Sequence, residues 1–181
     1  MTTLPRLTMV LGGAASGKSA FAEKTALLAS SSEKCYIATA QAFDDEMHTK
    51  IARHKSTRAA DGWTTLEQPL EVAALLPTIP AEQVALLDCA TLWLTNHLLA
   101  GSDLARVSTD LIAALARCPA TVVVVTNEVG QGIVPEHAMS RQFREAQGVL
   151  NQMIAREAQL VVQVIAGLPQ VLKGKLPEGL S

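Results

Sequence analysis

The chain has 181 residues, of which 49% are hydrophobic, 18% are charged and only 3% are aromatic. This composition excludes a disordered chain and predicts a single domain, residues 1–181, whose core is built from aliphatic side chains. Fifteen basic residues oppose seventeen acidic ones without forming a basic block, which argues against a nucleic-acid-binding surface.

Short apolar runs alternate with helix-like stretches along the chain. The runs predict buried strands at 7–11, 35–39, 84–89, 121–126 and 160–166, with a weaker strand at 63–66. Helical patterns occupy 18–29, 45–58, 70–76, 91–99, 104–117 and 139–158. This alternation predicts an α/β fold with a mostly parallel sheet covered by helices on both faces. From about residue 168 the Gly- and Pro-rich sequence predicts an irregular tail.

The chain carries three widely spaced cysteines, Cys35, Cys89 and Cys118, and no CxxC pair. Their odd number and spacing predict reduced, mostly buried thiols in a cytoplasmic protein rather than a metal site or disulfides. No apolar run approaches the roughly 20 residues needed to span a bilayer. We therefore expect a soluble protein without a membrane span.

The segment Gly12-Gly13-Ala14-Ala15-Ser16-Gly17-Lys18-Ser19 matches the P-loop pattern G-x-x-x-x-G-K-[ST]. Glycines let the backbone curl so that its N–H groups point at phosphate oxygens, and the following helix adds its positive dipole end. In such a loop Lys18 reaches the β- and γ-phosphates of ATP or GTP, and the Ser19 hydroxyl ligates Mg²⁺. An incidental Gly-rich turn is the alternative, but the predicted flanking strand and helix disfavour it.

Asp88 closes the apolar run 84–89 and is a second candidate for the Mg²⁺ site. An acidic residue at the end of a buried strand is costly without a partner, which favours a role near the metal. The alternative is that Asp88 caps the helix predicted to start at Thr91.

His54 lies in a predicted helix, on the same face as Met47 and Ile51 and beside Arg53 and Lys55. The spacing alone is typical of an interfacial packing histidine. A cationic setting near a nucleotide would instead keep the imidazole neutral and attract α-phosphate oxygens. The acidic residues at 44–46 are more typical of helix capping than of metal binding.

Several further motifs occur in a fixed order with the P-loop: Tyr36-Ile37-Ala38-Thr39-Ala40, Ile51-x-x-His54, Trp63-x-Thr65-x-Glu67, Asp88-Cys89-x-Thr91-Leu92-Trp93 and Thr126-Asn127-Glu128-Val129-Gly130-x-Gly132. Together they resemble the bifunctional adenosylcobinamide kinase/adenosylcobinamide-phosphate guanylyltransferase family of cobalamin biosynthesis, from about residue 7 to 167. Ala15 departs from the family pattern, which usually has arginine there, and would weaken one phosphate contact. The spacing between His54 and Trp63 also varies in the family.

The resemblance implies a RecA-like fold, a homotrimer and two reactions. A nucleoside triphosphate phosphorylates adenosylcobinamide; then a histidine takes GMP from GTP and passes it to adenosylcobinamide phosphate. His54 occupies the position of that histidine. The resemblance also implies nucleotide contacts and, less strongly, substrate binding by Asn127 and Glu128. The implied nucleotide contacts outside the P-loop, in addition to Asp88 proposed above, are Ala38, Thr39, Ala40, Lys55, Arg58 and Glu67. For Glu67 the alternative is a solvated loop carboxylate.

Two other functions remain possible from the sequence. A small-metabolite P-loop kinase without nucleotidyl transfer would fit everything except His54 and the loop after Asn127. A RecA-like ATPase that binds nucleic acid or a partner protein would fit the P-loop, but the balanced charge disfavours it.

Overall fold

In the computed structural model of this protein, residues 4–29, 33–41 and 62–180 are described. Within these ranges seven strands form one sheet in the order β3-β2-β4-β5-β1-β6-β7. All neighbours are parallel except β7, which is antiparallel to β6. The strands are β1 (Leu7–Gly12), β2 (Lys34–Ala38), β3 (Trp63–Glu67), β4 (Val84–Asp88), β5 (Thr121–Asn127), β6 (Leu160–Ile165) and β7 (Leu168–Lys173).

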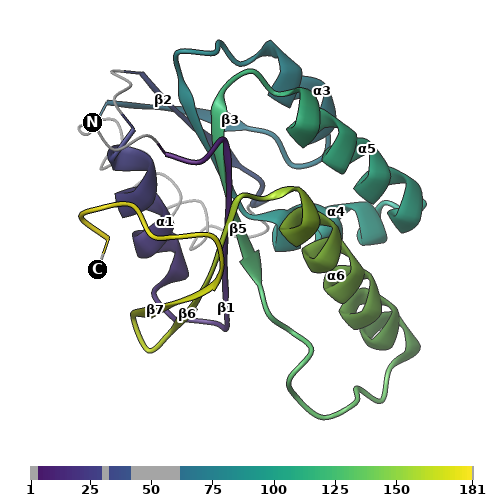
Figure 1. Ribbon diagram of the computed structural model, residues 1–181. Helices are drawn as coiled ribbons and strands as arrows, with labels where there is room; N and C mark the ends of the chain where they lie inside the picture. The colour runs from purple at the N-terminus through teal and green to yellow at the C-terminus, as the bar shows by residue number, and fades with distance from the viewer. Residues whose placement is uncertain (1–3, 30–32, 42–61, 181) are drawn as a thin grey trace.

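Helices cover both faces of the sheet, as Figure 1 shows. On one face lies α1 (Lys18–Leu27). The other face carries α3 (Val72–Leu75), the short 3₁₀ helix η1 (Leu76–Thr78), α4 (Ala90–Leu99), α5 (Leu104–Arg117) and α6 (Ala138–Glu157). The predicted α/β class with a mostly parallel, doubly covered sheet is therefore confirmed.

The central strands are apolar because both of their faces are buried. Along β5, Val122 and Val124 pack under α4–α6, whereas Val123 and Val125 pack under α1. All four are fully buried. Alternate side chains of a strand point to opposite faces, so a continuous Val run is what a strand covered on both sides requires.

The C-terminal prediction was wrong for residues 168–173, which form β7 instead of an irregular tail. A two-residue turn at Ala166 and Gly167, with φ of 53° and 80°, returns the chain alongside β6. Such left-handed turns suit the twist of a hairpin. Pro169 is tolerated because β7 is an edge strand with one unpaired side. Within the predicted tail, residues 174–180 lack helix and strand.

The three cysteines are buried free thiols. Burial raises the pKa of Cys35 and of Cys89 to about 11, and it raises the pKa of Cys118 as well. Nearby Cys118 adds to the rise at Cys35. Because a raised pKa leaves less thiolate at neutral pH, these residues belong to the core and not to a reactive centre.

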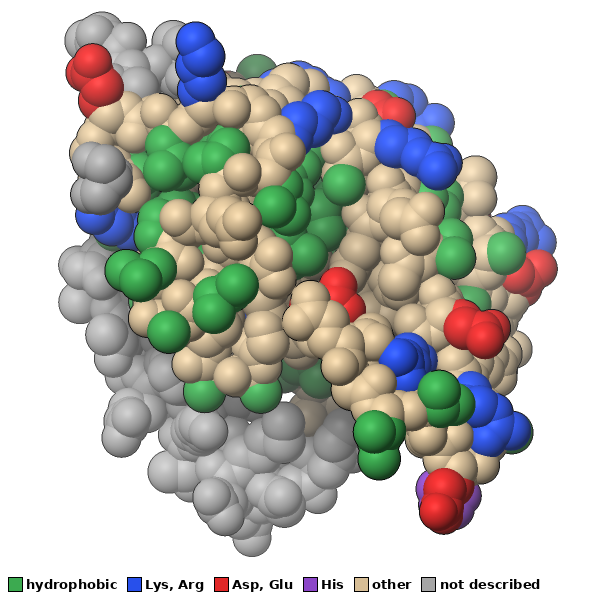
Figure 2. Space-filling model, turned by 60° about the horizontal axis from the view of Figure 1, so that its bottom comes forward, with side chains coloured by type: hydrophobic (Ala, Val, Ile, Leu, Met, Phe, Trp, Pro, Cys, Tyr) green, Lys and Arg blue, Asp and Glu red, His purple; other side chains and the backbone are tan. Residues whose placement is uncertain are grey.

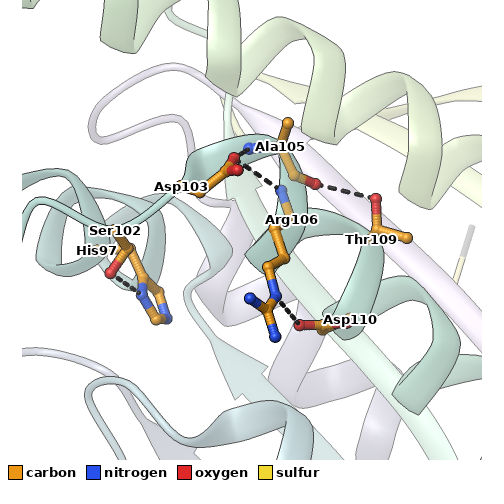
Figure 3. A network of polar contacts seen from close by, with 7 residues as sticks. All are labelled: His97, Ser102, Asp103, Ala105, Arg106, Thr109 and Asp110. Atoms are coloured by element: carbon orange, nitrogen blue, oxygen red, sulfur yellow. Dashed lines mark hydrogen bonds and ion pairs between the residues drawn. The ribbon is translucent and has the colours of Figure 1, made fainter.

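The connection from α4 to α5 is fixed by a small polar network (Figure 3). Asp103 is the N-cap of α5, and its Oδ1 accepts hydrogen bonds from the backbone N–H groups of Ala105 and Arg106 at 3.0 and 3.1 Å. Further along the helix, Arg106 Nε and Asp110 Oδ2 lie 4.0 Å apart in an exposed ion pair. The cap satisfies two N–H groups that the helix itself leaves unpaired.

Replacing Asp103 with Ala should lower the free energy of unfolding by about 1 kcal/mol, because the two N–H groups lose their acceptor. The measurement is chemical denaturation followed by circular dichroism. Asp110→Ala is the matched control and should cost only a few tenths of a kcal/mol, since an exposed ion pair contributes little. Equal losses in the two variants would contradict the capping role.

Candidate nucleotide site

The parallel register brings the predicted site positions to one edge of the sheet. Gly12 ends β1 and lies opposite Asn127 at the end of β5. Asp88 ends β4 opposite Ala38, which in turn lies opposite Glu67 at the end of β3. Ligands of open α/β sheets bind outside these carboxyl ends, so one edge unites residues from five strands.

The P-loop leaves β1 and enters α1 through two residues with positive φ. Gly17, the N-cap of α1, has φ of 92°, and Ala15 has φ of 54°. Gly17 has no side chain to cap the helix, so the first N–H groups of α1 lack a side-chain acceptor. Lys18 Nζ donates a 3.0 Å hydrogen bond to the Gly13 carbonyl, which holds the ammonium over the loop. Uncapped N–H groups and a nearby cation both favour a bound phosphate.

Two distant segments brace the P-loop through backbone hydrogen bonds. The Gly167 N–H, in the β6–β7 turn, donates to the Ser16 carbonyl at 2.8 Å. The Glu128 N–H, just beyond β5, donates to the Gly12 carbonyl at 3.1 Å. Within the described part of the chain, Ser16 Oγ is buried without a hydrogen-bond partner. The loop is thus held at both ends by other parts of the fold.

Asp88 is half-buried, and its Oδ2 accepts a 2.6 Å hydrogen bond from the Tyr36 hydroxyl. The N-cap of α4 is Cys89, whose Sγ accepts from the Leu92 N–H, so the alternative of Asp88 as the helix cap was wrong. Burial is the main cause of the raised pKa of Cys89. The nearby Asp88 carboxylate raises this pKa further, whereas Lys18 lowers it. Lys18 and Asp88 therefore lie within electrostatic reach of the same thiol.

The donor set at this edge suits Mg²⁺. Ser19, in the first turn of α1, is half-buried and offers a hydroxyl, while Asp88 offers a carboxylate. In the described ranges no three His, Cys, Asp or Glu side chains cluster as a metal cage. Mg²⁺ commonly binds one or two protein oxygens and completes its shell with phosphate oxygens and water, so a sparse donor set fits a metal that arrives with a nucleotide.

The three nucleotide contacts predicted at the end of β2, which are Ala38, Thr39 and Ala40, differ in solvent exposure. Thr39 is fully buried, and its hydroxyl donates to the Cys89 carbonyl and accepts from the Cys89 N–H, both at 2.8 Å. Asn96 Nδ2 donates to the Thr39 carbonyl at 2.8 Å. Thr39 thus ties β2 to the Asp88–Cys89 segment, whereas Ala38 and Ala40 on either side are half-buried.

Glu67 is exposed at the far end of the edge, beside a shallow hollow. The hollow has a volume of about 330 Å³ and is lined by Thr65, Leu66, Glu67, Gln68 and Leu75. His54, Lys55 and Arg58 lie outside the described residues, as does the helix predicted at 45–58.

The loop between β5 and α6 projects beyond the sheet edge in Figure 1. Glu128 Oε1 accepts from the Gly130 N–H at 2.6 Å, so this carboxylate is used within the loop. Arg144 on α6 donates to the carbonyls of Ile133, at 3.0 Å, and Gly130. Arg141 donates similarly to two later loop carbonyls. Sequence reasoning missed both arginines, because nothing local signals a bond to a loop up to 14 residues earlier.

The face that contains this edge carries charges of both signs. Figure 2, which brings the lower end of Figure 1 forward, shows Lys and Arg side chains interspersed with Asp and Glu. Among the described side chains of this face the two signs of charge are mixed, unlike the single-signed basic stripe that binding to a nucleic-acid backbone requires.

A family model described as cobinamide kinase / cobinamide phosphate guanyltransferase matches residues 8–172. The chain belongs to this family. The bifunctional adenosylcobalamin biosynthesis protein CobP of Pseudomonas aeruginosa is 44% identical to it, over 92% of this chain and 97% of the relative. The protein of the same description named CobU, from Escherichia coli, is 41% identical, over 92% and 99%. The resemblance inferred from the motifs is confirmed, and the chain is an enzyme of this bifunctional kind.

The fold has distant structural relatives as well. The crystal structure of the flagellar accessory protein FlaH from Methanocaldococcus jannaschii matches with a TM-score of 0.51 and 12% identity, covering 93% of this chain and 78% of FlaH. This likeness concerns the fold alone and agrees with the RecA-like P-loop architecture. Across the described ranges, none of the helices is both long and apolar enough to cross a membrane.

The close packing at Gly12 generates a test of the loop. A Cβ at Gly12 would lie 2.5 Å from Ser16 Oγ and 2.6 Å from the Val164 carbonyl oxygen, whereas a Cβ at Gly13 meets nothing within 4 Å. Gly12→Ala should therefore lower the free energy of unfolding by about 1–3 kcal/mol, as overpacking does, and weaken triphosphate binding. Gly13→Ala should leave stability almost unchanged. Thermal denaturation measures the stability of each variant, and a nucleotide titration measures its triphosphate affinity. Equal stability of the two variants would contradict the close packing around Gly12.

Proposed function

We propose that the protein phosphorylates adenosylcobinamide with a nucleoside triphosphate and then transfers GMP from GTP to adenosylcobinamide phosphate through a guanylyl group on His54. The observation that carries the proposal is the shared sheet edge at which the P-loop and Asp88 meet in a chain of this family. A simple metabolite kinase is disfavoured by that membership.

In the kinase reaction the P-loop would hold the triphosphate. The backbone N–H groups of 13–18 and the positive end of the α1 dipole would bind the β- and γ-phosphate oxygens. Lys18 would neutralise charge that develops as the γ-phosphoryl group moves to the substrate hydroxyl. Ser19 and Asp88 would hold Mg²⁺, which supplies charge neutralisation between the phosphates when bound.

The geometry of the edge supports one extended nucleotide site. From β1 to β3 the sheet order crosses four strand spacings of about 4.8 Å, or roughly 19 Å. A nucleotide anchored at Gly12 would pass Asp88 and the half-buried Ala38 and Ala40. It would then place its ribose or guanine near Glu67 and the adjoining hollow. Thr39 would contribute by holding Ala38 and Ala40 in place beside the nucleotide, because its hydroxyl, N–H and carbonyl are already bonded to Cys89, Asp88 and Asn96.

In the guanylyl transfer His54 would act as the nucleophile. A lone pair of the neutral imidazole attacks the α-phosphorus of GTP, a P–N bond forms, and the bond to the bridging oxygen breaks as pyrophosphate leaves. An oxygen of adenosylcobinamide phosphate then attacks the same phosphorus and the imidazole departs. Lys55 and Arg58 are proposed to bind the nucleotide phosphates. Asn127 and Glu128 are proposed on the substrate side, and the homotrimer stays a prediction.

Lys18→Ala should reduce both activities by several powers of ten, because both reactions use a triphosphate held by the same loop. Lys24→Ala is the matched control, since Lys24 is exposed in the last turn of the same helix. The two half-reactions are followed separately by chromatography of the corrinoid products. Near-normal turnover of either reaction in folded Lys18→Ala would mean that the triphosphate binds elsewhere.

Incubation with GTP and Mg²⁺ should add one GMP to the protein, as measured by intact mass. The adduct should be acid-labile and base-stable, as expected of a P–N bond. His54→Asn should lose the adduct and the guanylyl transfer but keep much of the kinase activity, since the P-loop is unchanged. Labelling should also decline below about pH 6, because a protonated imidazole has no free lone pair.

Two histidine variants serve as controls for that experiment. His48→Asn and His137→Asn should both retain the adduct; His137 is exposed ahead of α6 and caps nothing with its side chain. A His54→Asn protein that still becomes guanylylated, with the label mapped to another residue, would contradict the assignment of His54 as the nucleophile. If the wild-type protein shows kinase turnover but forms no adduct with GMP, a metabolite kinase without nucleotidyl transfer would be favoured.

A further inference from the structure

Four polar side chains are buried together between β5, α4 and α6. Thr126 and Gln147 are fully buried, and Thr91 and Asn151 are 5% and 8% exposed. Asn151 Oδ1 accepts hydrogen bonds from the Thr126 hydroxyl at 2.7 Å and from Gln147 Nε2 at 2.9 Å. Gln147 Nε2 also lies 3.0 Å from Thr126 Oγ1. We refer to these four residues as the buried amide network.

At the positions of this network, apolar side chains would stabilise the fold more than polar ones do. Leu150 and Ile154, on the same inner face of α6, are fully buried in the aliphatic core. Transfer of amides from water into such surroundings is unfavourable unless every polar atom is bonded, yet Gln147 Oε1 has no partner in the described ranges. Stability alone therefore does not account for the network.

The network ends on the backbone of Asn127, the last residue of β5. The Asn127 N–H donates to Thr91 Oγ1 at 2.7 Å, and Asn151 Nδ2 donates to the Asn127 carbonyl at 3.0 Å. Both backbone polar groups of Asn127 are thus held by side chains from the helix layer. Asn151 is the residue that joins the deep amides to this backbone.

Asn127 is where the chain leaves the sheet beside the phosphate loop. It lies opposite Gly12 in the β1–β5 register, and the next N–H, that of Glu128, donates to the Gly12 carbonyl at 3.1 Å. Asn127 Oδ1 is buried here without a partner among the residues with assigned positions. Any shift of the Asn127 backbone would move both this amide and a bond that braces the P-loop.

We infer that Asn151, held in place by Gln147 and Thr126, is a positioning residue for phosphoryl transfer: it fixes the Asn127–Glu128 backbone against the first residue of the P-loop. The inference rests on the proposed kinase reaction and adds a contribution from α6. In-line transfer depends on placement, so a small displacement of the loop lowers the rate more than it lowers nucleotide affinity.

Asn151→Asp tests this with almost no change in shape. A carboxylate retains the oxygen that accepts from Thr126 and Gln147 but loses the N–H that reaches the Asn127 carbonyl. The kinase kcat should fall about 10- to 100-fold, with little change in KM for the triphosphate. Ile154→Val, one turn further along the same buried face of α6, is the control and should keep wild-type kcat. An unchanged kcat in folded Asn151→Asp would overturn the inference.

Amide hydrogen exchange provides a readout that does not depend on activity. In Asn151→Asp the peptide containing Glu128 should exchange faster than in the wild type, while the β6 peptides should keep their protection. Unchanged exchange around Glu128 would overturn the inference even if turnover fell. If the wild type fails to phosphorylate adenosylcobinamide, the proposed function fails, but exchange still decides whether Asn151 fixes this backbone.

Thr91→Val is a second variant, available if Asn151→Asp does not fold. It removes only the hydroxyl that accepts from the Asn127 N–H. The same signature is expected: lower kcat, similar KM and faster exchange near Glu128. A folded Thr91→Val protein with wild-type values for all three would count against the positioning role.

Discussion

The phosphate loop keeps its shape because backbone groups from two distant segments hold it. The N–H of Gly167 binds the Ser16 carbonyl, and the N–H of Glu128 binds the Gly12 carbonyl. Each bond requires a complete tertiary fold: the first needs the β6–β7 hairpin, and the second needs β5 in register with β1. A P-loop sequence alone supplies flexible glycines, and the fold supplies the order that an anion site built from them would need.

The same edge places polar groups at the ends of two central strands. β4 is apolar until its last residue, Asp88, and β5 ends on Thr126 and Asn127 after four valines. These two strand ends lie between Gly12 and Ala38 in the sheet order. Tyr36 and Thr39 then fix the β2–β4 side of the edge, and Thr91 and Asn151 fix the β5 side. Supporting bonds thus surround positions that a nucleotide and its metal would use, which is the arrangement expected of a preorganised catalytic site.

Much of the fold could be predicted from local sequence, and so could the position of the P-loop between β1 and α1 in the candidate site. The P-loop is contiguous, and the Val and Leu runs identify buried strands without any knowledge of their partners. β7 was missed because Gly167 and Pro169 indicate breaks locally, whereas the pairing with β6 is a tertiary outcome. Asn151 was missed for a related reason, although Gln147 and Asn151 at i and i+4 on an otherwise apolar helix face were an available signal.

The most direct test of this account is a crystal structure with a non-hydrolysable GTP analogue and Mg²⁺. We predict that the β- and γ-phosphates lie on the backbone N–H groups of 13–18, with the metal between Ser19 and Asp88 and the guanosine extended toward Glu67. The Glu128–Gly12 bond should be retained in that complex. A triphosphate bound away from the carboxyl edge of β1, β4 and β5 would contradict the account.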